Sequence, residues 1–147
     1  MLRLFLITAP TIEHVPALVV ALRPYAPVSV SAHRELAEAG AALSGALGAS
    51  FGVEERLRDG SDAIALIEEY AGGGEGPLVV LASEDVARAV VVHALDAPVV
   101  GPRLAFDPGG LAEIEVRLDS PWTVSRLNEI CHDTPDTSSS DGGIVRT

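Results

Sequence analysis

The stretch Leu78-Val79-Val80-Leu81-Ala82 decides the fold of this chain. It is a continuous apolar run that follows Pro77 and leads directly into Ser83, Glu84 and Asp85. Such a run is typical of a strand buried on both faces of a parallel sheet. The serine and the acidic residues are typical of a helix N-terminus, where the helix dipole favours negative charge. We therefore predict a strand over 78–82 and a helix that continues to about Leu95 and ends before Pro98.

The residues before this stretch repeat the alternation of short apolar runs with amphipathic segments. We predict further strands over 3–7, 28–31 and 50–53. We also predict three helices. The first helix covers 11–25 and begins at Pro10 or Thr11. The second covers 33–47 and ends at Gly48. The third covers 61–70, with Ser61 as its N-cap and glycines 72–74 after it.

The C-terminal part has a different pattern. After the turn at 107–110, the segments 111–118 and 122–127 alternate apolar with polar residues, and Asp119-Ser120-Pro121 between them reads as a hairpin turn. The sequence thus predicts an α/β fold with three layers, α/β/α. Its central sheet is mostly parallel, with a C-terminal antiparallel hairpin at the edge. Residues 1–132 form one domain, and we expect the polar segment 133–147 to be a flexible tail.

Charge and composition exclude several classes of function. The chain has 147 residues and a net charge of −11, which repels nucleic acid and anionic membrane surfaces. It contains no lysine, which excludes Schiff-base chemistry and a P-loop lysine. A single cysteine, Cys131, excludes an internal disulfide and a multi-cysteine metal site. We expect a cytoplasmic, bacterial protein with no nucleic-acid or membrane partner, no metal and no cofactor.

Several segments resemble, in the same order along the chain, those of the histidine phosphatase (phosphoglycerate mutase-like) superfamily. Residues 3–7 are similar to its first strand, and residues 31–40 are similar to its Ser-x-Leu-x-Arg-Ala helix. Residues 56–59 are similar to its Leu-x-Glu segment, and residues 79–90 are similar to the strand and helix at its second catalytic histidine. Residues 107–111, together with 126–128 and His132, are similar to its closing pattern. The resemblance spans roughly residues 2–132 and implies the fold predicted above.

The groups that the family's phosphoryl transfer requires are replaced at the matching positions. Ala9 stands where the nucleophilic histidine would follow the first strand, and Thr8 replaces a phosphate-binding arginine. Glu35 falls at the position of the helix arginine, and Ser83 at the second histidine. Only Asp59 retains a carboxylate in place of the family's glutamate. Since phosphoryl transfer needs cations around the anionic oxygens, the resemblance implies a degenerate member without catalytic residues for that mechanism.

Polar side chains nevertheless gather at the predicted carboxyl end of the sheet, where open α/β sheets bind ligands. We predict a pocket lined by residues from this end: Thr8, Thr11, His14, Arg34, Asp59, Ser83 and Glu84. Structural roles compete with this interpretation. Ser83 and Glu84 also suit a helix N-terminus, and Asp59 suits a turn. His14 and His33 suit capping or surface positions, and His93 and His132 suit packing.

Two hypotheses for the function follow. The first is a pseudophosphatase, a non-catalytic module that binds an unknown small ligand or protein partner. The second is a small-molecule enzyme of different chemistry, such as isomerisation, cyclisation or hydrolysis of a neutral or cationic substrate. A deep pocket that joins His14 or Asp59 to Ser83 or Glu84 would favour the enzyme, and a shallow one the module. Self-association as a homodimer is a third alternative.

Overall fold

The computed structural model describes residues 1–73, 76–96 and 104–131. Its strands are β1 (Leu2–Thr8), β2 (Ser29–Ala32), β3 (Ser50–Val53), β4 (Leu78–Ala82), β5 (Leu111–Val116) and β6 (Thr123–Glu129). Its α-helices are α1 (Val15–Leu22), α2 (Ala37–Leu47), α3 (Gly60–Gly73) and α4 (Glu84–Leu95). Short 3₁₀ turns precede or follow them, namely η1 (Ile12–His14), η2 (Arg23–Tyr25), η3 (Arg34–Leu36) and η4 (Glu55–Arg58).

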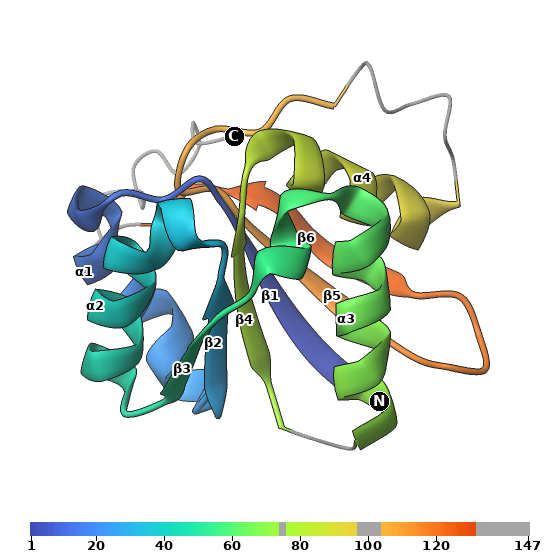
Figure 1. Cartoon of the computed structure of the whole chain (residues 1–147), viewed down its shortest axis with the longest axis horizontal. Coiled ribbons are helices and arrows are strands. Elements are labelled where there is room, and N and C mark those ends of the chain that lie inside the picture. Colours follow the sequence, from blue (N-terminus) through green and yellow to red (C-terminus); the bar gives the residue numbers. More distant parts are fainter. Residues whose placement is uncertain (74–75, 97–103, 132–147) are drawn as a thin grey trace, which may run out of the picture.

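The strands form one six-stranded sheet in the order β3-β2-β4-β1-β5-β6. Strands β3, β2, β4 and β1 are mutually parallel, so their carboxyl ends share one edge. The C-terminal hairpin runs the other way, since β5 pairs antiparallel with β1 and β6 pairs antiparallel with β5. The predicted architecture is confirmed: a mostly parallel sheet lies between two helical layers, with the hairpin at one edge (Figure 1).

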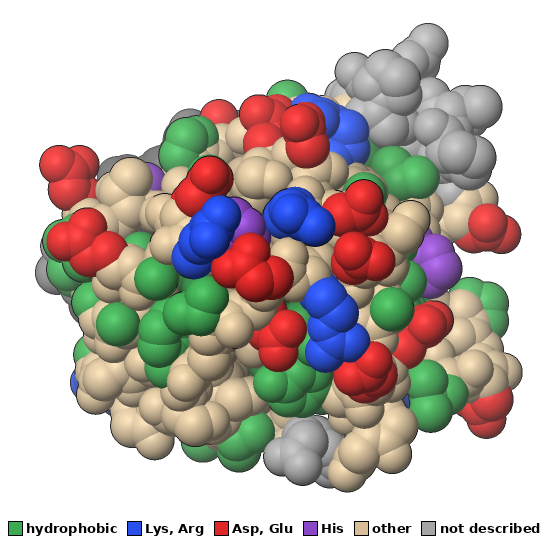
Figure 2. Space-filling model, in the orientation of Figure 1, with side chains coloured by type: hydrophobic (Ala, Val, Ile, Leu, Met, Phe, Trp, Pro, Cys, Tyr) green, Lys and Arg blue, Asp and Glu red, His purple; other side chains and the backbone are tan. Residues whose placement is uncertain are grey.

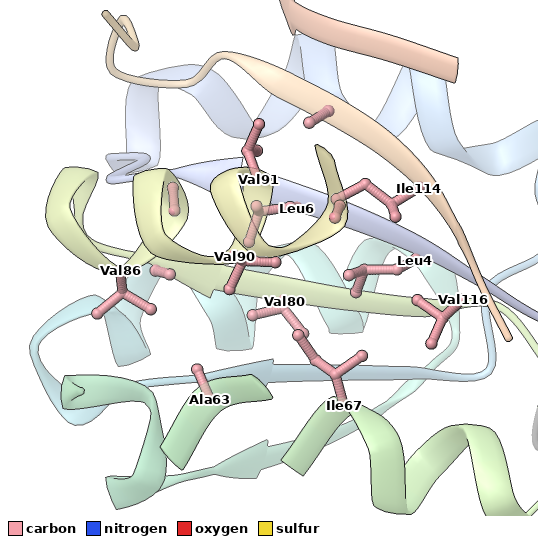
Figure 3. Close-up of a cluster of buried hydrophobic side chains, with 14 of the residues drawn as sticks. Leu4, Leu6, Ala63, Ile67, Val80, Val86, Val90, Val91, Ile114 and Val116 are labelled. Carbon is pink, nitrogen blue, oxygen red and sulfur yellow. The ribbon is translucent and has the colours of Figure 1, made fainter. Parts of the chain in front are cut away.

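Alternation along the strands divides the core into two clusters. On one face of the sheet, Leu4, Leu6 and Val80 pack under α3 and α4, with Ile67 and Val90 above them (Figure 3). On the other face, Phe5, Ile7 and Val79 pack under α1 and α2. Every residue of β4 is buried, as the continuous apolar run predicts for a strand with helices on both sides.

Several predicted boundaries are wrong, and proline accounts for two of them. The helix predicted over 11–25 is three elements, because Pro16 fits only the first turn of α1 and Pro24 has no N–H with which to continue the helix. The helix predicted over 33–47 begins as the 3₁₀ turn η3, and α2 starts only at Ala37. Gly48, which is left-handed with φ of 71°, ends α2 as predicted.

Other corrections concern a helix start and the hairpin. Ser61 is not the N-cap of α3, because the Asp59 carboxylate before it accepts the N–H groups of Ser61 and Asp62 at 2.8 and 3.2 Å. The hairpin strands are shifted, since β5 ends at Val116 and β6 runs to Glu129. The end of α4 at Leu95 is as predicted. Residues 133–147, predicted to be a flexible tail, and His132 and Pro98 lie outside the described residues.

Candidate functional site

The carboxyl ends of the parallel strands bring the positions of interest together. β1, β4 and β2 are neighbours in the sheet and end at Thr8, Ala82 and Ala32. The backbone N–H of Ala9 donates to the carbonyl oxygen of Ala82 at 2.7 Å. Ala9 and Ser83, the two positions at which the resemblance requires imidazoles, are therefore next to each other at this edge. Neither side chain is a nucleophile activated by a base.

The backbone at the end of β1 is tightly fixed. Ala9 has φ of 37°, a left-handed conformation that is strained for a residue with a Cβ. The carbonyl oxygen of Thr8 accepts from Gly109 at 2.6 Å, and the N–H of Thr8 donates to Gly110 at 3.0 Å. Thr8 itself is only 2% exposed, so it does not line an open pocket as predicted. Its side chain follows Leu4 and Leu6 on the α3 and α4 face.

Each histidine at this edge accepts a backbone hydrogen bond. The His14 Nδ1 accepts the N–H of Thr11 at 2.9 Å and lies 3.2 Å from the Thr11 hydroxyl. The His14 ring also packs against Gly109, so closely that a Cβ at position 109 would lie 2.5 Å from the ring. His33 Nδ1 accepts the N–H of Glu35 at 3.3 Å. Both rings are thereby used to begin η1 and η3, which agrees with the capping interpretation.

Asp59 and Ser83 cap separate helices. Ser83 Oγ accepts the N–H of Val86 at 3.3 Å and begins α4, whereas Asp59 begins α3. Glu84 is paired with Arg88 at 2.7 Å on the same helix. Arg88 in turn donates to the carbonyl oxygen of Leu104 and so ties α4 to the segment before β5. The side chain of Arg34 is 72% exposed and lies 3.9 Å from Glu55.

A crevice does exist, between the loop after β1 and the start of α2. Its volume is about 580 Å³, and its walls are Ala9, Pro10, Thr11, Ile12, Glu13, Glu35, Leu36, Glu38 and Ala39. Of the seven predicted pocket residues, only Thr11 lines it. The sequence marks Glu35 only as the residue at the position of the family's helix arginine, and Glu13 and Glu38 were not predicted to line a pocket. The sequence does contain a signal for these carboxylates. Each acidic residue follows a parallel strand and lies within the first turns of the next helical segment.

The crevice is thus bordered by carboxylates, with no guanidinium or imidazole among its lining residues. A site of this charge repels a phosphate dianion. In the described part of the chain, no group of three His, Cys, Asp or Glu residues is placed to hold a metal ion. Burial raises the pKa of the Cys131 thiol, and Glu129 raises it further, which keeps the thiol protonated and poorly nucleophilic at neutral pH.

A second hollow of about 600 Å³ lies at the end of the sheet opposite to the carboxyl ends of the parallel strands. The C-terminal half of α4 and the connection between β5 and β6 form most of its wall, including His93 packed edge-on against Trp122 with ring centroids 4.7 Å apart. This contact supports the packing role predicted for His93. None of the seven candidate residues reaches this hollow.

Comparison with solved structures identifies the fold. A mycobacterial glucosyl-3-phosphoglycerate phosphatase matches with a TM-score of 0.75 and 13% identity, covering 86% of this chain and 99% of that one. Bacillus stearothermophilus YhfR matches with a TM-score of 0.80 and 10% identity over 91% of this chain and 100% of that one. Plasmodium falciparum phosphoglycerate mutase matches with a TM-score of 0.70 and 14% identity over 92% and 94%. The chain has the histidine phosphatase fold.

The likeness is one of structure, since no protein-family model and no curated protein matches the sequence. The order of segments on which the resemblance was based is nevertheless the order of this histidine phosphatase fold: the first strand, then the α2 region, then β4 with α4, then the closing hairpin. Among the described residues, no helix combines the length and apolar character needed to cross a membrane.

Proposed function

We propose that this chain is a non-catalytic protein with the histidine phosphatase fold, which acts as a ligand- or protein-binding module. One observation carries the proposal. Ala9 and Ser83 occupy adjacent strand ends, joined by the hydrogen bond from Ala9 N–H to Ala82 O, and neither supplies an imidazole. Phosphoryl transfer by the histidine mechanism needs a nucleophile at that point, and alanine offers none.

Charge at the neighbouring crevice supports the same proposal. Glu13, Glu35 and Glu38 border it, so a phosphate group entering it would meet like charge on several sides. A neutral or cationic ligand, or such a group on a partner protein, would meet no such repulsion. The fixed backbone around Thr8 and Gly109 offers a rigid base for binding, which lowers the entropy cost of forming a complex.

The alternative of a small-molecule enzyme has less support. It predicts a deep pocket in which His14 or Asp59 contacts Ser83 or Glu84. Instead, His14 contacts Thr11, Asp59 caps α3, Ser83 caps α4, and Glu84 pairs with Arg88. The crevice is open, and its lining includes the exposed residues Thr11, Glu13, Glu35 and Glu38, which fits a binding surface better than a site that excludes water.

The test compares catalysis with binding in the purified chain. We expect no hydrolysis of p-nitrophenyl phosphate or of 3-phosphoglycerate above the buffer rate, and no rise in Tm with orthovanadate, an oxyanion of the kind bound by the mycobacterial neighbour. A panel of neutral and cationic metabolites should contain compounds that raise Tm, and the Glu35→Ala/Glu38→Ala variant should lose that rise. Turnover of a phosphomonoester at an ordinary enzymatic rate would contradict the proposal.

A further inference from the structure

No role described so far uses the second hollow, which lies at the other end of the sheet from the crevice. The C-terminal half of α4, one side of α3 and the connection between β5 and β6 form its walls, and in Figure 1 these parts lie together on the right. Its volume of about 600 Å³ is in the range of small-molecule sites in proteins. We call it the Trp122 hollow, after the tryptophan in its wall.

Part of the lining is apolar. The side chain of Leu118 is 63% exposed although it lies close to α3, where a Cβ at Gly72 would be 3.7 Å from it. Val92 of α4 and Pro121 add further apolar surface. Because covering such surface releases water and favours binding, the hollow suits a ligand with an apolar side chain.

Trp122 brings a hydrogen-bond donor to the hollow. Its side chain is only 9% exposed, and its indole N–H has no acceptor among the residues that the structure describes. A buried indole N–H usually has a partner, since an unpaired one costs free energy. The ring is held by its edge-on contact with His93, at 4.7 Å between centroids. A ligand in the hollow would supply the missing acceptor.

Arg117 adds a cationic donor next to the indole. Arg117 and Trp122 lie at the two ends of the connection between β5 and β6, which the pairing of Glu115 with Thr123 brings together. The Arg117 side chain is 48% exposed, and its nearest carboxylate oxygen, from Glu115, is 3.7 Å away. A guanidinium binds a carboxylate through parallel hydrogen bonds. This part of the wall therefore suits the carboxylate of a ligand.

The helical part of the wall carries the opposite charge. Asp96 ends α4 in a left-handed conformation, with φ of 52°, next to the carbonyl groups that the last turn of the helix leaves open. The carboxyl end of a helix dipole attracts cations. Glu68 of α3 lines the same hollow, and neither carboxylate has an ion pair within the described part of the chain. This side of the hollow suits an ammonium group.

The charge of the whole chain disfavours a purely anionic ligand. The chain has 21 acidic and 10 basic residues, and Figure 2 shows acidic side chains over the centre, top and right of the visible face. This field repels an anion, whereas a zwitterion has no net charge and is not repelled. A carboxylate is therefore best accepted here when an ammonium group accompanies it.

We propose that the Trp122 hollow is a binding site for a free amino acid with an apolar side chain. The ligand carboxylate accepts hydrogen bonds from Arg117 and Trp122, and its ammonium group lies against Asp96 and the end of α4. Its side chain covers Val92 and Leu118. The site is separate from the crevice at the carboxyl ends of the strands, so this inference does not depend on the function proposed above.

The only tryptophan of the chain reports on this site directly. Titration of the full chain with L-phenylalanine, to about 10 mM so that weak binding is covered, should change the Trp122 fluorescence in a saturable way. The matched probes are 3-phenylpropionate, which lacks the ammonium group, and 2-phenylethylamine, which lacks the carboxylate. Each should bind at least about tenfold more weakly, because a charge-assisted hydrogen bond is lost.

Two variants assign the two ends of the ligand. Arg117→Gln should weaken L-phenylalanine and 3-phenylpropionate about tenfold and leave 2-phenylethylamine unchanged. Asp96→Asn should weaken L-phenylalanine and 2-phenylethylamine and leave 3-phenylpropionate unchanged, and asparagine tolerates the left-handed backbone. Arg58→Gln and Asp62→Asn are the controls, because both residues are exposed and neither lines the hollow.

Isothermal titration calorimetry measures the affinities, and far-ultraviolet circular dichroism shows that each variant is folded. Three results would each overturn the proposal. The first is no saturable fluorescence change with L-phenylalanine, and the second is equal affinity for L-phenylalanine and both analogues. The third is a loss of affinity in the control variants as large as that in Arg117→Gln and Asp96→Asn.

Discussion

The N–H of Ala9 donates a 2.7 Å hydrogen bond to the carbonyl oxygen of Ala82, and this bond joins the ends of two parallel strands. Ala9, the residue that follows β1, is left-handed with φ of 37°. The proposal of a non-catalytic module depends on this position, because a methyl group cannot act as a nucleophile.

Replacing Ala9 by glycine should stabilise the protein. Ala9 has φ of 37°, and a Cβ in the left-handed region costs about 1 to 2 kcal/mol, part of which is regained because glycine loses more backbone entropy on folding. We expect a net gain of about 0.5 to 1 kcal/mol in the free energy of unfolding by urea. Ala41→Gly, on the exposed side of α2, should lose a similar amount, and a loss at both positions would show that Ala9 is not strained.

Gly109 should tolerate no side chain. Its φ is +82°, and a Cβ would lie 2.5 Å from the His14 ring, so Gly109→Ala combines backbone strain with a clash. We expect a loss of about 2 kcal/mol or more in the free energy of unfolding. Gly45→Ala is the matched control, because its Cβ would meet open space on a helix, and it should gain about 0.5 to 1 kcal/mol. Equal effects would contradict the packing of His14 on this turn.

The buried carboxylate of Glu113 should contribute more to stability than that of its half-buried neighbour on β5, Glu115. It accepts from Arg3 at 2.6 Å and from Arg126 at 2.9 Å, and both guanidinium groups lie within 6 Å of the Tyr25 ring. Burial lowers the pKa of Arg126, but the hydrogen bond to Glu113 helps to raise it overall. Glu113→Gln should cost about 2 to 4 kcal/mol, less than breaking a fully buried pair because both arginines are about one-third exposed.

Glu115→Gln is the control for that prediction. Glu115 is two residues further along the same strand, on the same face as Glu113, and lies 3.7 Å from the exposed Arg117. A surface pair of this kind contributes about 0 to 1 kcal/mol. Chemical unfolding of both variants measures the difference, and a smaller effect at Glu113 than at Glu115 would refute the assignment of a structural ion pair.

Charge reversal at the crevice should alter anion binding. In the wild type, inorganic phosphate should not raise Tm, because Glu13, Glu35 and Glu38 border the crevice. Glu35→Arg/Glu38→Arg should give a phosphate-dependent rise in Tm that weakens with salt, without phosphatase activity, since no nucleophile is created. Glu68→Arg/Glu69→Arg on α3 makes the same change in charge elsewhere and should give no rise. A phosphate effect already present in the wild type would contradict this picture.

The thiol of Cys131 should react slowly. Its pKa is raised by burial and by Glu129, so at neutral pH the folded protein holds a smaller fraction of thiolate than a free cysteine does. We expect alkylation by iodoacetamide to be several-fold slower in the folded than in the urea-unfolded chain. Because the proton is held more tightly in the folded state, this group's contribution to stability is present below the unfolded pKa of about 8.5 and is lost as pH rises through the folded value. Equal alkylation rates would contradict it.

The sequence alone was sufficient for the layers of the fold. Continuous apolar runs such as Leu78–Ala82 identify strands buried on both sides, because only such strands have no solvent face. The alternation of apolar and polar residues after Leu111 identifies the hairpin, whose second strand, β6, alternates between half-buried and exposed residues. The expectation that Ala9 and Ser83 stand where the resemblance implies histidines also came from the sequence, since position relative to a strand end is a property of the chain order.

Only the tertiary structure decided which polar groups meet. The sequence places Thr8, His14, Asp59 and Ser83 near one edge of the sheet. In the structure Thr8 is buried, and the other three side chains accept backbone hydrogen bonds that cap helical segments. It also decided that the carboxylates of Glu13 and Glu38 face a common crevice. Burial, capping and charge apposition depend on side-chain directions a few ångströms apart in space, and segments distant in the chain set those directions only when they pack together.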